Sequence, residues 1–391
     1  MNIEAIRKDT PGCKSKIHFN NAGASLPPLP VTAAIHDYIS FESITGGYEA
    51  ADSRKNEIEE YYASASRLIN TNENNIAFTS SATSSFSLAL SSIPFEQGDI
   101  VLIANEDYIS NQIAFLSLQQ RFGIKLIRTK SLSTGGVDLN DMEKLINDHH
   151  PKLVSLTHVP TNTGLIQPVE MVGKMCKNKD ILYLVDACQS AGQIPLDVKK
   201  IGCDFLTATM RKFLRGPRGA GFLYVSDRVL EKKLTPLFVD MRGAEWTGPD
   251  TYEVRMTAKR FEEWELPYAL VVGSKEAINY ALNIGIENIQ NRNKVLCDML
   301  KSKLNSIELK ILDIGENQSS IITIEMPGKQ PQGVLEYLRA VNINTSTAHR
   351  SSAQIDFKSK KVDWALRISP HYFNTEDEID ILIQTLEDLK N

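Results

Sequence analysis

The stretch Tyr183–Val225, YLVDACQSAGQIPLDVKKIGCDFLTATMRKFLRGPRGAGFLYV, decides how the rest of the chain is interpreted. Its pattern predicts a strand, a helix, a second strand, and a glycine-punctuated turn that leads into a third strand. The continuously apolar run 182–185 is typical of a strand covered by helices on both faces. Asp186 follows this strand, and Lys212 follows the second strand at 204–208. Because open α/β sheets bind their ligands at the carboxyl ends of strands, both residues are candidate functional groups.

An acid and a lysine in these two places favour one chemistry. A desolvated carboxylate is costly unless it has a cationic or hydrogen-bonding partner. A lysine near such an acid can form a Schiff base with an aldehyde cofactor, while the acid keeps the cofactor's pyridinium nitrogen protonated. Taken singly, an aspartate after a strand is more often a helix cap and a lysine is usually solvated, so the hypothesis depends on Asp186 and Lys212 acting together.

Two motifs, VDACQSAG and TMRKFLRGPRGAGFLYV, resemble the core signature of the class V aminotransferase and cysteine desulfurase group of fold-type I pyridoxal phosphate (PLP) enzymes. The resemblance extends from HFNNAGASLPP near the start of the chain to LRISPHYFNTEDEID near its end. It implies an α/β fold, with a large domain built on a mainly parallel sheet between helices and a smaller α+β C-terminal domain. It also implies that PLP is the cofactor, that Lys212 is the Schiff-base lysine, that Asp186 is the pyridinium partner and that Gln189 donates to the phenolic oxygen.

Length and composition limit the other classes of function. A chain of 391 residues favours two domains, which we place at 21–265 (PLP-binding) and 266–391 (small), after a lead-in at 1–20. A net charge of -5 from 43 basic and 48 acidic residues gives no sign of nucleic-acid binding. We expect no signal peptide, because residues 1–16 are charged, and no membrane-spanning segment. Five cysteines without C-x-x-C spacing predict reduced thiols and no metal site, so we expect a cytoplasmic protein.

The cofactor's phosphate is expected at a turn between a strand and a helix. The short strand at 76–79 breaks into Ser80–Ser84, where a helix begins. Backbone N–H groups and the positive end of the helix dipole bind phosphate at such a turn. The resemblance places the phosphate on Ala82 and Thr83.

Two more strand ends supply candidate cofactor contacts. The strand at 99–104 is followed by Tyr108, whose ring can lie on the pyridine face. The family often has histidine at this position. After the strand at 153–158, related enzymes place an asparagine beside the phenolic oxygen; here Thr161 and the following Asn162 are both candidates.

Thr209 and Arg211, just before the lysine, complete the candidate cofactor contacts. Arg211 occupies a position where many relatives have histidine, and a guanidinium there can pair with the phosphate through two hydrogen bonds. The glycines that follow are no nucleotide-binding loop, because no G-K-[ST] follows and the next element is a strand.

The candidate substrate contacts come from the two ends of the chain. Asn21, Ala22 and Gly23 lie in a proline-rich loop at 20–28, which the resemblance places near the substrate carboxylate; an ordinary turn is the alternative. Arg367, in LRISPHYFNT, matches the family arginine that binds the α-carboxylate of an amino acid.

Two features depart from the desulfurase pattern. Trp264-Glu265 replaces the Gly-Thr of the family motif Arg-Phe-Glu-x-Gly-Thr, so a phosphate contact from the partner subunit is not carried over. The loop at 343–352 lacks the sulfur-accepting cysteine of desulfurases. Cys297 is upstream in a predicted helix, and we expect it to be a buried, inert thiol.

The rest of the sequence predicts one loop and several helices. We predict a mobile active-site loop at 236–257, a helix capped by Asn140 and a C-terminal helix that begins with the capping box Thr375–Glu378. Further helices are predicted at 31–41, 53–69, from 111, at 270–304 and at 331–341.

These details resemble the branch that contains hercynylcysteine sulfoxide lyases and isopenicillin-epimerase-like proteins. The resemblance implies a PLP-dependent lyase in which Lys212 removes the α-proton of an S-substituted cysteine or its sulfoxide. β-Elimination then cleaves the C–S bond and yields pyruvate and ammonia. The alternatives are an aminotransferase or epimerase acting on an amino acid, and a non-catalytic scaffold protein that retains the fold. The family also implies a homodimer.

Overall fold

Seven strands form the central sheet of the computed structural model, which describes residues 1–390. In their order across the sheet they are β2 (Ile76–Thr79), β8 (Gly221–Val225), β7 (Phe205–Thr209), β6 (Leu182–Asp186), β5 (Leu153–Thr157), β3 (Ile100–Ile103) and β4 (Lys125–Arg128). The five strands from β7 to β4 are parallel to one another, whereas β8 is antiparallel to both of its neighbours. The predicted mainly parallel sheet is therefore confirmed.

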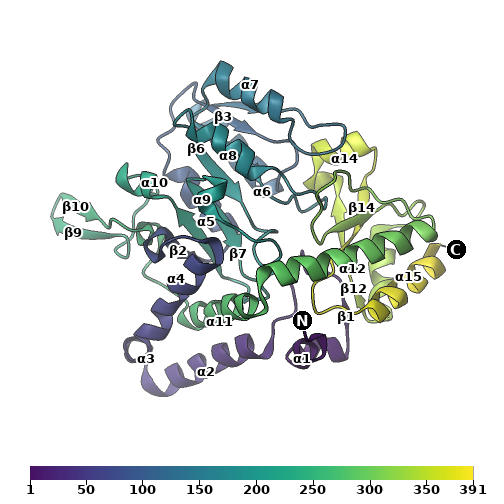
Figure 1. The fold of residues 1–391 in the computed structure, drawn as a ribbon. Helices are drawn as coiled ribbons and strands as arrows, with labels where there is room; N and C mark the ends of the chain where they lie inside the picture. The colour runs from purple at the N-terminus through teal and green to yellow at the C-terminus, as the bar shows by residue number, and fades with distance from the viewer. Residues whose placement is uncertain (391) are drawn as a thin grey trace.

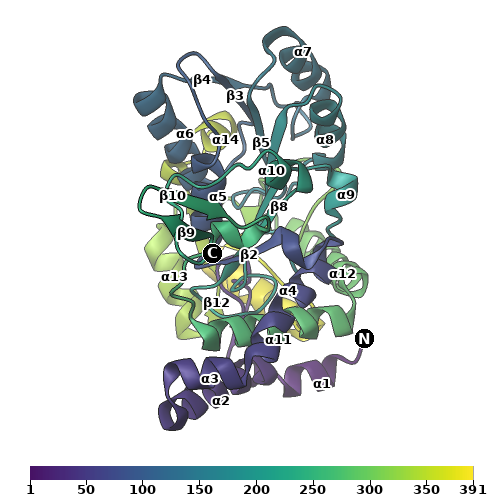
Figure 2. The same ribbon diagram turned by 90° about the vertical axis from the view of Figure 1, so that its left-hand side faces the viewer.

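Both faces of this sheet are covered, as the apolar strands require. Successive residues of β6 alternate between two cores: Tyr183 and Val185 pack on one face, and Leu184 packs on the other. Figure 2 shows the strands between α6 on one side and α7, α8 and α9 on the other. The covering helices are α5 (Ala82–Ser91), α6 (Ile109–Phe122), α7 (Leu139–His149), α8 (Val169–Lys177), α9 (Val198–Ile201) and α10 (Asp227–Glu231).

The C-terminal part of the chain forms a second, smaller layer of helices and strands (Figure 1). Its antiparallel sheet has the order β11 (Ile322–Ile324), β14 (Trp364–Ile368) and β13 (Ser346–His349). The helices are α12 (Ile286–Ser306), α13 (Pro331–Ala340), α14 (Gln354–Lys360) and α15 (Glu376–Lys390). The predicted capping box is confirmed, because Thr375 Oγ1 accepts from the Glu378 backbone N–H while Glu378 Oε2 accepts from the Thr375 N–H.

Packing near both predicted domain boundaries is shared between the two cores. The N-terminal β1 (Ile17–His18) pairs with β12 (Ile343–Asn344) of the small domain. Helix α11 (Tyr268–Ile284) contributes to the core of the large domain. The division at 20/21 and 265/266 therefore stays a proposal. The other helices are α1 (Ile3–Lys8), α2 (Leu29–Thr45), α3 (Gly47–Ser53) and α4 (Lys55–Ile69), with 3-10 turns at Pro11–Lys14, Glu73–Asn75, Ala258–Phe261 and Arg350–Ser352.

The single helix predicted at 270–304 is wrong. Gly285 divides it into α11 and α12, and its backbone φ of +89° is a conformation that L side chains rarely adopt. The predicted cap at Asn140 is also wrong. The Asp138 carboxylate caps α7 instead, accepting hydrogen bonds from the N–H groups of Asn140 and Asp141.

The segment predicted as a loop at 236–257 contains a β-hairpin instead. Strands β9 (Ala244–Gly248) and β10 (Thr251–Val254) pair in antiparallel fashion, and Figure 1 shows them projecting from the large domain. The buried Arg260 guanidinium anchors the base of the hairpin by donating to the Arg255 carbonyl at 2.8 Å. Within residues 1–390, no helix is long and apolar enough to cross a membrane.

Candidate active site

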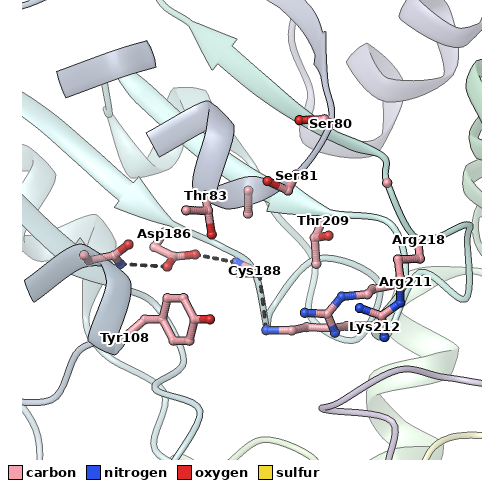
Figure 3. A pocket seen from close by; sticks show the side chains of 13 residues that line it. Ser80, Ser81, Thr83, Tyr108, Asp186, Cys188, Thr209, Arg211, Lys212 and Arg218 are labelled. Atoms are coloured by element: carbon pink, nitrogen blue, oxygen red, sulfur yellow. Dashed lines mark hydrogen bonds between the residues drawn. The ribbon is translucent and has the colours of Figure 1, made fainter. Parts of the chain in front are cut away.

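A cavity of about 300 Å³ lies at the edge of the central sheet where β2, β3, β6 and β7 end (Figure 3). All four strands place their carboxyl ends at this edge, so residues far apart in the sequence meet there. Seven of the sequence-predicted residues line the cavity: Ala82, Thr83, Tyr108, Asp186, Thr209, Arg211 and Lys212.

Asp186 is the last residue of β6, and its carboxylate is held by two neutral donors. Its Oδ1 accepts from the Cys188 backbone N–H at 2.9 Å, and its Oδ2 accepts from the Asn111 side-chain amide at 2.9 Å. The residue is 5% exposed and has no salt bridge within the described residues. A buried anion without a cation matches the nitrogen of a protonated pyridine ring.

Lys212 reaches the cavity from the turn after β7. Its Nζ lies 3.3 Å from Cys188 Sγ and 6.0 Å from the centre of the Tyr108 ring. Figure 3 shows Lys212 and Arg211 facing Asp186 and Tyr108 from the opposite side. The turn is fixed by close packing against Gly192, where an added Cβ would lie 2.5 Å from the Phe213 carbonyl carbon. Only glycine permits this approach, so the segment after β6 positions the lysine.

The first turn of α5, where the phosphate is predicted to bind, lies at the cavity wall. Ser81 caps this ten-residue helix by accepting from the Ser84 N–H, and Ala82 and Thr83 follow at the cavity wall. Thr209 also faces the cavity, and its hydroxyl donates to the Ala220 carbonyl at 3.3 Å. The N-terminal end of α5 is suited to an anion, but the contact of Ala82, Thr83 and Thr209 with the phosphate stays a prediction.

Gln189, Thr161 and Arg367 form a connected polar group beside the cavity. The Thr161 hydroxyl accepts from Gln189 Nε2 at 2.9 Å and from Arg367 Nη1 at 2.7 Å. Gln189 Oε1 and Arg367 Nε are buried and lack a hydrogen-bond partner within the described residues. Burial, together with the nearby Arg211, lowers the pKa of Arg367 to about 10. A cation with only neutral partners and an unused N–H is suited to a ligand carboxylate.

The three residues of the N-terminal loop contact this group mainly through their backbone. Gln189 Nε2 also donates to the Ala22 carbonyl at 3.1 Å, and Arg211 donates to the Gly23 carbonyl. The Asn21 side chain is buried and bonds to the Ser369 carbonyl at 2.8 Å. Their predicted contact with substrate is untested; in the structure the Ala22 N–H donates to Ser369 Oγ and the Gly23 N–H donates to the Asn20 carbonyl.

Thr161 and Asn162, which the sequence left as alternatives, lie in different surroundings. Thr161 joins Gln189 and Arg367, whereas Asn162 Nδ2 donates to the Ser352 carbonyl at 3.4 Å, toward the small domain. Sequence reasoning missed Asn111, Cys188, Arg218 and Gly219 as cavity residues. Asn111 and Cys188 both form hydrogen bonds with Asp186. Cys188 lies within the quoted stretch 183–225, and Asn111 lies at the start of a predicted helix, but no motif or spacing identified either as a cavity residue.

A family model described as "Aminotransferase class-V" matches residues 17–382. The chain belongs to this family. It is 28% identical to a probable cysteine desulfurase of Methanothermobacter thermautotrophicus, over 100% of this chain and 98% of the relative. It is 27% identical to a probable hercynylcysteine sulfoxide lyase of Mycobacterium tuberculosis, over 95% of this chain and 89% of the relative. The structure of an apo cysteine desulfurase from Thermococcus onnurineus NA1 superimposes with a TM-score of 0.91 at 26% identity, covering 99% of this chain and 97% of that one.

The predicted family, fold class and cofactor are confirmed. Pyridoxal 5'-phosphate is the cofactor, and the cavity fits it. The buried Asp186 carboxylate could face the ring nitrogen, and the Lys212 amine could reach the aldehyde, because both line the same cavity. The predicted donation from Gln189 to the phenolic oxygen stays a prediction, since Gln189 Nε2 donates to Ala22 and Thr161.

No cysteine stands in the loop where the family resemblance implies a sulfur-accepting thiol in desulfurases. The strand β13 and the turn after it, within residues 343–352, contain no cysteine. Cys297 on α12 is 4% exposed and lies against Ser320, and burial raises the pKa of its thiol to about 11. The prediction that Cys297 is buried is thus confirmed, and its high pKa disfavours the thiolate that would attack sulfur.

Proposed function

We propose that this protein is a PLP-dependent carbon–sulfur lyase that performs β-elimination on an S-substituted cysteine or its sulfoxide. The proposal is supported most by the placement of Lys212 and Asp186 in one cavity with the buried Arg367 in the polar group beside it, together with a cysteine-free loop at 343–352. Such a site can break a C–S bond, but it has no thiol on that loop to accept the sulfur atom. The relative named as a hercynylcysteine sulfoxide lyase supports the same direction.

Recognition of the substrate would depend on Arg367. Its buried guanidinium would hold the α-carboxylate, with the Thr161 hydroxyl and Gln189 fixing the guanidinium plane. The backbone of Ala22 and Gly23 would close the same side of the site. This arrangement would orient the α-carbon toward Lys212.

The residues that line the cavity are proposed to hold the cofactor. Asp186 would meet the ring nitrogen and the Tyr108 ring would face the pyridine. The first turn of α5 at Ala82 and Thr83 would hold the phosphate, with Thr209 and Arg211 beside it. When bound, PLP supplies an electron sink for the carbanion formed at the α-carbon.

The chain's own chemical task is to move one proton. Lys212 takes the α-proton; the electron pair of that C–H bond forms the Cα–Cβ double bond, and the sulfur leaves with the electrons of the Cβ–S bond. The leaving group is a thiolate, or a sulfenate when the substrate is a sulfoxide, and it is then protonated. The remaining 2-aminoacrylate takes up water to give pyruvate and ammonium. No oxidant or reductant is needed.

We also propose that two copies of the chain associate. Large apolar side chains are exposed at the hairpin and its approach, including Phe238 at 86%, Trp246 at 78% and Tyr252 at 60%. Clustered exposed aromatic residues support a protein interface. The cytoplasmic location expected from the sequence stays a prediction.

The proposal is tested by measuring pyruvate release from a panel of S-substituted cysteines and their sulfoxides, with PLP added. We expect release by the native protein and at least a 1000-fold loss in Lys212→Ala, because the general base is removed. Lys199→Ala, an exposed lysine on α9, is the matched control and should retain full activity.

Two results would contradict the proposal. If an amino acid converts the cofactor to its amine form while no pyruvate appears, the protein is an aminotransferase. If the purified protein takes up no PLP, the protein is a scaffold that retains the fold.

A further inference from the structure

A chain of hydrogen bonds runs from the cavity wall to a second carboxylate that the mechanism above does not use. The Asn111 side-chain amide donates to Asp186 Oδ2 at 2.9 Å and to Asp107 Oδ1 at 2.9 Å. Asn111 is 3% exposed, and an amide has two N–H groups, so both are committed to carboxylates. The orientation of the Asp186 carboxylate therefore depends on what holds Asn111.

Asp107 is held by neutral donors only. Besides Asn111, its Oδ1 accepts from the Tyr108 backbone N–H at 2.7 Å and from the Thr157 hydroxyl at 2.5 Å, and its Oδ2 accepts from Gln112 at 2.8 Å. Within the described residues it forms no salt bridge. Burial raises the pKa of Asp107, and the hydrogen bonds from Thr157 and Asn111 oppose that shift. A half-buried carboxylate with four neutral donors and no cation is unusual at a loop, and two of its donors, Tyr108 and Asn111, line the cavity.

Asp107 is linked to both groups assigned to the cofactor ring, to Tyr108 directly and to Asp186 through Asn111. Through Asn111 it fixes the carboxylate for the ring nitrogen, and through its bond to the Tyr108 N–H it fixes the start of α6, from which the aromatic ring projects. The Thr157 hydroxyl ties the same oxygen to the end of β5, so the loop after β3 is anchored to a buried strand.

We propose that Asp107 is a positioning residue for the cofactor, which sets the Asp186 and Tyr108 contacts together through one carboxylate oxygen. This inference rests on the proposed roles of Asp186 and Tyr108, but not on the reaction catalysed. The hydrogen-bond acceptor at Oδ1, rather than the negative charge, is the group that does the positioning.

Two substitutions separate the acceptor from the charge. Asp107→Ala removes the acceptor, and the dissociation constant for PLP should rise about tenfold, because hydrogen bonds to a charged group are lost. The absorption maximum of the bound cofactor should shift as well, because the nitrogen contact loosens. Asp107→Asn keeps an oxygen in the Oδ1 place, and Gln112 can turn its amide to meet the new N–H group. This variant should bind PLP within threefold of the native protein.

The control is Asp99→Ala, which removes a carboxylate paired with Lys152 at 2.7 Å just before β3. It should change neither the dissociation constant nor the absorption maximum. Thermal melting of each protein without PLP establishes that the variants are folded.

The inference is overturned if folded Asp107→Ala binds PLP with native affinity and absorption, or if Asp107→Asn is as impaired as Asp107→Ala. Asp186→Asn separates this failure from a failure of the site assignment. If Asp186→Asn leaves the spectrum unchanged, the assigned role of Asp186 is wrong. If Asp186→Asn alters the spectrum and Asp107→Ala does not, the proposed positioning role of Asp107 is wrong, while the assigned role of Asp186 stands. None of these measurements requires turnover.

Discussion

At the scale of single residues, Arg367 is the clearest sign of a ligand. Its guanidinium is buried, its partners Thr161 and Asn20 are neutral, and its Nε has no partner within residues 1–390. A buried cation without an acid is unfavourable unless a ligand supplies the negative charge.

Replacing Arg367 should therefore weaken substrate binding and spare the cofactor. In Arg367→Ala the KM for the best S-substituted cysteine should rise about 100-fold, equivalent to about 3 kcal/mol, while the dissociation constant for PLP stays within twofold. Arg339→Ala, an exposed arginine on α13, is the control. An unchanged KM in Arg367→Ala would show that Arg367 does not bind the substrate carboxylate.

The lowered pKa of Arg367 adds a pH dependence. With a pKa of about 10, the guanidinium is charged at neutral pH and loses its proton as the pH rises through 10. The affinity for a carboxylate should be constant between pH 7 and 9 and should fall above pH 10. Inhibition by a substrate-sized carboxylate that lacks an amino group measures this directly. Inhibition that stays constant up to pH 11 would contradict the prediction.

The sequence predicted the site only where a motif or a strand end marked a residue. Asp186, Lys212 and Tyr108 all follow strands, and the structure gathers them around one cavity. Asn111 and Cys188 could not be found this way, because their role depends on which atoms meet across β3 and β6. A periodic sequence pattern does not show which side chains form hydrogen bonds with one another in the folded protein.

At the scale of elements, strands were predicted better than helix ends and turns. The apolar runs of β5, β6 and β7 define buried strands, and the structure confirms them. The join between α11 and α12 was missed, since a glycine inside a helical pattern is often tolerated. The hairpin β9–β10 was missed because its strands are short and mostly exposed, so the one alternating face with the cross-strand pair Trp246 and Tyr252 was not recognised.

The backbone conformation of Gly285, between α11 and α12, predicts how glycine substitutions change the free energy of unfolding. Gly285→Ala forces an L side chain to a φ of +89°, so it should lower the free energy of unfolding by about 1–2 kcal/mol. Gly333→Ala, at a position in α13 where an added Cβ meets nothing within 4 Å, should raise it by about 0.5–1 kcal/mol. Urea unfolding of the two variants checks both signs. Equal effects would show that the left-handed conformation at Gly285 is not required.

At the scale of the whole molecule, the exposed apolar side chains near the hairpin predict self-association. The native protein should sediment as a dimer at micromolar concentration, and the double variant Phe238→Asp/Trp246→Asp should sediment as a monomer, because charges are buried poorly at an apolar interface. Val295→Asp, on the exposed face of α12 and away from the hairpin, should remain a dimer. A native monomer in sedimentation velocity would contradict the proposed homodimer.

The proposed reaction cleaves the C–S bond by elimination. The most direct measurement is the ratio of pyruvate to alanine formed by the PLP-loaded protein from its best S-substituted cysteine. Elimination predicts one pyruvate for each C–S bond broken and no alanine, because Lys212 removes a proton and the sulfur leaves with its electron pair. Transfer of the sulfur to a protein thiol would leave the amino acid as alanine. Alanine as the main product would therefore rule out elimination as the reaction of this site.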